Sequence, residues 1–125
     1  MDWSKYPNFT EKEFKCSHTG KCEMRPEFME KLQALRLQFN RPLIISSGYR
    51  DITHPIEAAK ESRGEHTYGC AADIAIRGTE ALRLIALAYD MGFRRIGINQ
   101  KGDGRFVHLG MGDKLVHFPE ASWSY

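Results

Sequence analysis

The stretch His66–Ile74, HTYGCAADI, constrains the fold of this chain more than any other part of the sequence. It places two ionisable side chains, His66 and Asp73, among small and apolar residues that lead into a short strand, which we expect over Ala71–Ile76. Alternation along a strand turns Asp73 to the face opposite its apolar neighbours. That apolar face is formed by Ala72, Ile74 and Ile76. One side of this strand is therefore expected to face a core and the other to carry chemistry.

A second pair of strands is predicted further along the chain. Arg95–Asn99 and Arg105–Leu109 are joined by a glycine-containing segment, 100–104, that is typical of a hairpin loop. In the second of these strands, Val107 and Leu109 share the face opposite His108. If both apolar faces lie against helices, Asp73 and His108 emerge together on the open face of the sheet.

The helices follow from spacing and capping signals. Thr10–Glu13 fits a capping box that starts a short helix. Pro26–Phe39 has apolar residues at three- and four-residue intervals and is predicted to be an amphipathic helix. A further helix opens at Gly78. Its expected apolar face consists of Leu82, Ile85, Ala86 and Tyr89.

Three weaker elements complete the expected fold. Leu43–Ser46 is predicted to be a buried strand, 51–65 a functional loop in which Ile56–Lys60 forms one helical turn, and the tail with Trp123 an edge segment. The order of elements predicts a single α+β domain, residues 1–125, in which helices pack on one face of a small, mainly antiparallel sheet.

Composition excludes several classes of protein. Of the 125 residues, 18 are basic and 16 acidic, with the charges mixed along the chain, so we expect no nucleic-acid partner. No apolar run approaches the length of a membrane span, and no signal peptide is evident, so a chain made in the cytoplasm without membrane contact is expected. A monomer is the default. Three cysteines favour a reducing compartment or a metal role over a disulfide framework.

His66, Asp73 and His108 have the chemistry of a zinc (Zn2+) site. Two imidazoles and a carboxylate are the open three-ligand set of catalytic zinc, and the small residues 70–72 leave room around a metal. The alternative is that these side chains are hydrogen-bonded structural residues, and their spacing does not separate the two.

Four segments together resemble the M15 family of zinc peptidases, in its short phage and bacterial form. They are SSGYR (Ser46–Arg50), EHTYGCAADI (Glu65–Ile74), RRIGINQKGDGRFVHLG (Arg94–Gly110) and the closing WSY. The resemblance implies a hedgehog/DD-peptidase-like fold and a zinc ion held by His66, Asp73 and His108. It implies cleavage of peptidoglycan stem peptides, as a D-alanyl-D-alanine carboxypeptidase or an L-alanyl-D-glutamate endolysin acting at the bacterial cell wall.

The resemblance also implies roles around the metal. Arg50 would hold a substrate carboxylate or the developing oxyanion. Ser47 and Tyr49 would support substrate binding, and His54 would line the groove. As alternatives to a peptidase, the chain could be a zinc-bearing wall-binding module or a cysteine hydrolase that uses Cys70 with His66.

The general base is where the sequence departs from the family. An acid is common three residues before the last ligand or two after it, but these positions hold Arg105 and Gly110. We therefore predict Asp103 as the base. Asp113 and Glu65 are further candidates, and each of the three can also be a solvated surface charge. The short cluster of Cys16, His18 and Cys22 lacks a fourth ligand, which favours reduced thiols or a Cys16–Cys22 disulfide over a structural zinc site.

Overall fold

A five-stranded sheet forms the centre of the computed structural model, which describes residues 1–61, 63–112 and 118–125. The strand order is β1-β2-β4-β3-β5. Neighbouring strands are antiparallel except for β5, which runs parallel to β3 at one edge. The strands are β1 (Ile44–Ser47), β2 (Ala71–Ala75), β3 (Arg95–Asn99), β4 (Phe106–Gly110) and β5 (Ala121–Ser124). The predicted α+β fold with a mainly antiparallel sheet is confirmed.

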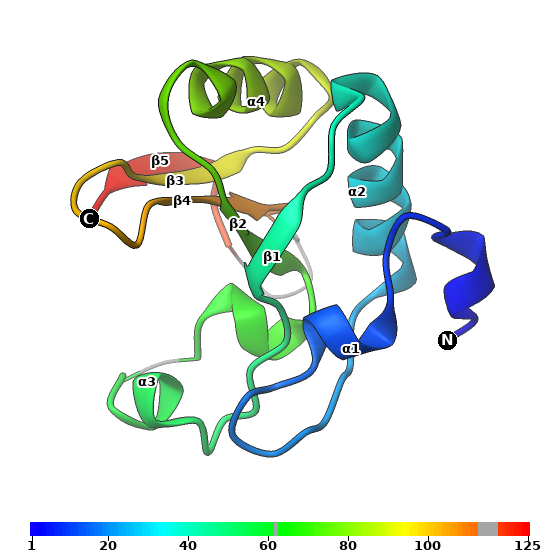
Figure 1. The fold of residues 1–125 in the computed structure, drawn as a ribbon. Helices are drawn as coiled ribbons and strands as arrows, with labels where there is room; N and C mark the ends of the chain where they lie inside the picture. The colour runs from blue at the N-terminus through cyan, green and yellow to red at the C-terminus, as the bar shows by residue number, and fades with distance from the viewer. Residues whose placement is uncertain (62, 113–117) are drawn as a thin grey trace.

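In the described part of the chain, four α-helices and two 3-10 turns surround the sheet (Figure 1). They are η1 (Trp3–Lys5), α1 (Glu11–Phe14), α2 (Pro26–Phe39), α3 (Pro55–Ala58), η2 (Glu65–Tyr68) and α4 (Gly78–Asp90). The predicted capping box is present: the backbone N–H of Thr10 donates to Glu13 Oε1 at 2.8 Å. None of these described helices is both long and apolar enough to cross a membrane.

The main core lies between the two longer helices and one face of the sheet. Ile74 pairs with Val107 across β2 and β4, and Ala72 pairs with Leu109. All four side chains are fully buried in one cluster with residues of α2 and α4. The alternation predicted for β2 and β4 is confirmed, and it leaves Asp73 and His108 on the opposite face.

Two packing predictions are wrong. The inner face of α4 consists of Ala81, Leu84 and Ala88, whereas Leu82 and Tyr89 of the predicted face are 69% and 60% exposed. Two of the three residues that α4 buries in the core are thus alanines. The second wrong prediction is that the strand after α2 is buried. β1 is an edge strand, since β2 is its only partner among the described strands, and its Ile44 is exposed.

Candidate metal centre and substrate pocket

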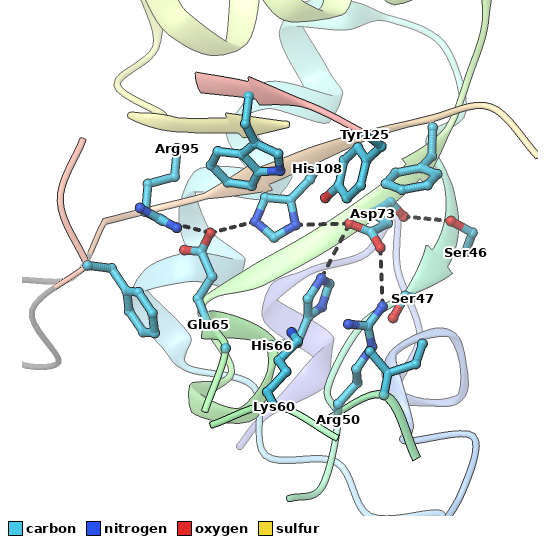
Figure 2. Close-up of a pocket in the computed structure, with 15 residues that line it drawn as sticks. Ser46, Ser47, Arg50, Lys60, Glu65, His66, Asp73, Arg95, His108 and Tyr125 are labelled. Carbon is cyan, nitrogen blue, oxygen red and sulfur yellow. Dashed lines mark hydrogen bonds and ion pairs between the residues drawn. The ribbon is translucent and has the colours of Figure 1, made fainter. Parts of the chain in front are cut away.

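His66, Asp73 and His108 converge on the face of the sheet away from α2 and α4 (Figure 2). Asp73 and His108 are directly opposite each other on β2 and β4, and His108 Nδ1 lies 3.0 Å from Asp73 Oδ1. His66 comes from η2, and its Nε2 lies 3.3 Å from the same oxygen. One ligand-type atom from each residue lies within 4.8 Å of the others, and all three residues are buried. The three residues singled out in the sequence are thus brought together.

The SGYR segment fixes the orientation of His66. His66 Nδ1 lies 2.7 Å from the Gly48 carbonyl oxygen, which can only accept, so Nδ1 carries a proton and Nε2 is the nitrogen that faces Asp73. Arg50 N–H donates in turn to the His66 carbonyl at 3.2 Å. Gly69 then ends η2 with a φ of 69°, a left-handed conformation that glycine adopts without steric cost.

The Asp73 carboxylate lies between the two imidazole rings, and the charges of the cluster shift the pKa values of its members. Burial by itself would raise the pKa of Asp73, but hydrogen bonds and charge interactions with His108 and His66 bring it well below its usual value. Burial would lower the pKa of His108, and its hydrogen bonds to Asp73 and Glu65 raise it instead. Ligands must be deprotonated to bind a metal, so a divalent cation in this cluster would take over the role of the imidazole proton.

Arg50 reaches the cluster from the segment that follows β1. One of its terminal nitrogens lies 3.5 Å from Asp73 Oδ2, and the other lies 3.2 Å from Glu57 Oε2. Glu57 also accepts hydrogen bonds from Lys60 Nζ and from the Gly64 backbone N–H, both at 2.9 Å. Burial would raise the pKa of Glu57, and these donors lower it. The sequence offered no sign of this role, because nothing in the local pattern marks the Glu57 side chain as buried.

Glu65 is a buried site residue and not one of the solvated charges that the sequence suggested. It is 4% exposed, with Oε1 2.5 Å from His108 Nε2 and 2.9 Å from Arg95 Nε. Among the described residues, its Oε2 is buried without a hydrogen-bond partner. The η2 turn directs this side chain to the sheet beside Gly110, and Arg95 offsets its charge. The one sign of this role in the sequence is that Glu65 directly precedes His66.

The cluster lies in a pocket of about 560 Å³. Its wall combines basic groups with aromatic rings and the cluster itself; the lining includes Arg50, Lys60, Arg95, Phe106, Phe118, Trp123 and Tyr125. The Trp123 ring lies 5.1 Å from the His108 ring, and Gly97 on β3 leaves space for it, since a Cβ there would come within 2.6 Å of Trp123 Nε1. The tail thus adds an edge strand, as predicted, and one wall of the pocket.

The other predicted site residues are dispersed. Ser47 lines the pocket. Tyr49 is buried with its hydroxyl 3.2 Å from Glu23, and His54 caps α3; neither lines this pocket. Asp103 is exposed in the β3–β4 loop, also outside the lining, and Asp113 lies outside the described residues.

The cysteines form no second centre in the described part of the chain. Cys16, Cys22 and Cys70 form no disulfide with one another, and the His66, Asp73 and His108 group is the one set of metal-ligand type found there. The Cys70 thiol donates to the Glu65 carbonyl at 3.5 Å and does not line the pocket. This arrangement favours a packing role for Cys70.

A buried His–Asp–His cluster that borders a pocket on an antiparallel sheet is typical of metal-dependent hydrolases. The family comparison gives the particular group: a family model described as Peptidase M15 matches residues 7–110. The chain belongs to the M15 peptidases, which are zinc-dependent. A comparison with curated proteins gives no match.

Proposed function

We propose that this chain is a zinc-dependent peptidoglycan peptidase that hydrolyses a stem-peptide amide bond involving D-amino acids. The bond would be of the D-Ala-D-Ala carboxypeptidase or the L-Ala-D-Glu endopeptidase type. The observation that carries the proposal is the convergence of His66, Asp73 and His108 in a pocket lined by charged and aromatic side chains, in a chain of the M15 family.

The residues fit zinc by their chemistry. Two imidazole nitrogens and one carboxylate oxygen, all buried and close together, are the three protein ligands of an open catalytic site. When bound, zinc would polarise the substrate carbonyl and lower the pKa of water at the site. The buried Glu65 beside His108 supplies the outer carboxylate that such sites use to orient a ligand histidine.

The chain's own side chains would bind and orient the substrate. Arg50 is fixed by Glu57 and directed at Asp73, so its guanidinium can hold a peptide carboxylate or the oxyanion that develops at the carbonyl. Lys60 lines the same pocket, and its half-exposed side chain would add a second contact to a carboxylate of the stem peptide. Ser47 lies at the same wall and would donate a hydrogen bond to the peptide.

We place the enzyme at the bacterial cell wall, as a phage endolysin or tail-associated protein acting as a monomer. The support is the family membership and the resemblance of the sequence to the short phage-like form. Neither a nucleic acid nor a membrane is needed for this activity.

The test is digestion of defined muropeptides after chelation and after zinc is added back, with products identified by mass spectrometry. We expect activity to disappear with the chelator, to return with zinc, and the products to name the bond. Activity that is indifferent to chelation would contradict the proposal. A second candidate is a zinc-bearing wall-binding module, favoured by the absence of acids at Arg105 and Gly110. It predicts cosedimentation with peptidoglycan without release of new amines.

A further inference from the structure

We propose that Glu65 is a positioning residue for His108, and that Gly110 lacks a side chain in order to make room for it. The inference rests on the proposed function in one respect, namely that His108 is a metal ligand. The two residues come from distant parts of the chain: Glu65 begins η2, and Gly110 ends β4.

The contacts of His108 define what Glu65 does. Glu65 Oε1 lies 2.5 Å from Nε2, while Nδ1 lies 3.0 Å from Asp73 Oδ1. An ionised carboxylate accepts and does not donate, so Glu65 places the ring proton on Nε2. Nδ1 then faces the ligand cluster, and its lone pair becomes available to a metal when the proton shared with Asp73 is released. A carboxylate that holds the far nitrogen of a ligand histidine fixes both the tautomer and the orientation of the ring.

Gly110 is explained by space and not by backbone conformation. Its φ is not among the positive values of the described glycines, so an L-residue could adopt this backbone. A Cβ built at Gly110, however, would lie within 2.5 Å of Glu65 Cδ and would collide with Oε2. Gly110 follows His108 by two positions and so shares its face of the strand. A side chain there and the Glu65 carboxylate would compete for the same volume.

Arg95 completes the seat of Glu65. It is directly opposite Gly110 on β3, and its Nε lies 2.9 Å from Glu65 Oε1. Its guanidinium is held by the Pro119 carbonyl oxygen at 2.6 Å and lies over the Trp123 ring. This fixed positive charge is the counter-ion of the buried carboxylate.

The experiment measures zinc affinity and not activity. Zinc dissociation constants, obtained by competition with a chromophoric chelator, are compared for the wild type, Glu65→Ala, Gly110→Asp and the double variant Glu65→Ala/Gly110→Asp. Glu65→Ala should weaken zinc binding by ~10–100-fold while the circular dichroism spectrum is retained. Gly110→Asp alone should also weaken it, because the two carboxylates collide.

The double variant is the decisive member of the set. A carboxylate at position 110 would occupy the volume that Glu65 vacates, so affinity should return to within about 3-fold of the wild type, a strongly non-additive result. The matched control is Glu61→Ala, an exposed glutamate in the neighbouring loop, which should leave affinity unchanged. Should Glu65→Ala not fold, Gly110→Ala displaces Glu65 without removing its charge, and it is expected to weaken zinc binding.

The outcomes separate the two proposals. Affinity within about 2-fold of the wild type in Glu65→Ala (or in Gly110→Ala where it replaces that variant), or additive losses in the double variant, would overturn the positioning role. They would leave Glu65 as a structural partner of Arg95, and the proposed function would stand. A wild-type chain that binds no zinc would instead overturn the proposed function, and this inference with it.

Discussion

Two buried glutamates flank the pocket, and they differ in how completely their oxygens are bonded. Glu57 uses both: Arg50 and Lys60 donate to Oε2, and the Gly64 backbone N–H donates to Oε1. Glu65 receives His108 and Arg95 on Oε1, and within the described residues its Oε2 has no partner. A buried oxygen without a hydrogen-bond partner costs free energy. The position of Glu65 is therefore better explained by its contact with His108 than by a gain in stability.

The partners of the two carboxylates also come from different parts of the chain. Glu57 binds Arg50, Lys60 and Gly64, which lie close to it in the sequence. It therefore ties this loop together and holds Arg50 at the pocket. The partners of Glu65 lie on β3 and β4, so it joins η2 to the sheet at the ligand cluster. Loss of Glu57 should therefore loosen a loop, whereas loss of Glu65 should alter the metal centre.

The largest effect is expected at the cluster itself. Asp73→Ala removes the oxygen that both ligand histidines approach, so zinc affinity should fall by more than the ~10–100-fold that an outer-sphere change costs. Turnover of muropeptides should be lost with it. Zinc content by atomic absorption checks this, with Asp90→Ala, an exposed aspartate at the end of α4, as the control. Full zinc occupancy in Asp73→Ala would mean that zinc binds at another site in the chain.

A smaller and different effect is expected at the loop. Glu57→Gln removes the carboxylate charge that Arg50 and Lys60 share and leaves Arg50 with Asp73 alone, so the free energy of unfolding should fall by about 1–3 kcal/mol while zinc is retained. Urea denaturation at pH 7 measures the difference. Glu61→Gln is the exposed control. Loss of zinc together with stability would contradict the view that Glu57 holds the loop while Glu65 acts at the metal centre.

The pH dependence of that difference has a definite sign. The pKa of Glu57 in the folded state is lowered from its usual 4.5, so its ionised form stabilises the fold above that pH. This contribution is lost as the pH falls below 4.5 and through the lower folded-state pKa. The stability of the wild type and of Glu57→Gln should accordingly converge in acid, in urea titrations at successive pH values.

Much of this architecture could be predicted from the sequence because it is written in local patterns. The bounds of α2 and β3 follow from apolar spacing, and strand alternation placed Asp73 and His108 on one face. The side chains that complete the site have no such pattern. Glu65 leaves a short 3-10 turn, where no periodicity tells which way it points, and its partners are thirty or more residues away. The inner face of α4 was missed because two of its three buried residues are alanines, whose small side chains give a weak apolar signal in the sequence.

The smallest effect is expected for Asp103, the carboxylate that sequence reasoning favoured as general base. It is exposed in the β3–β4 loop and does not line the pocket, so Asp103→Asn should change turnover by less than about 2-fold, as for an ordinary surface substitution. Steady-state kinetics on muropeptides with zinc content checked provide the measurement. If turnover collapses with zinc fully bound, the loop must bring Asp103 to the pocket during the reaction. Asp103 would then be the proton acceptor, and Glu65 would keep the role of positioning His108.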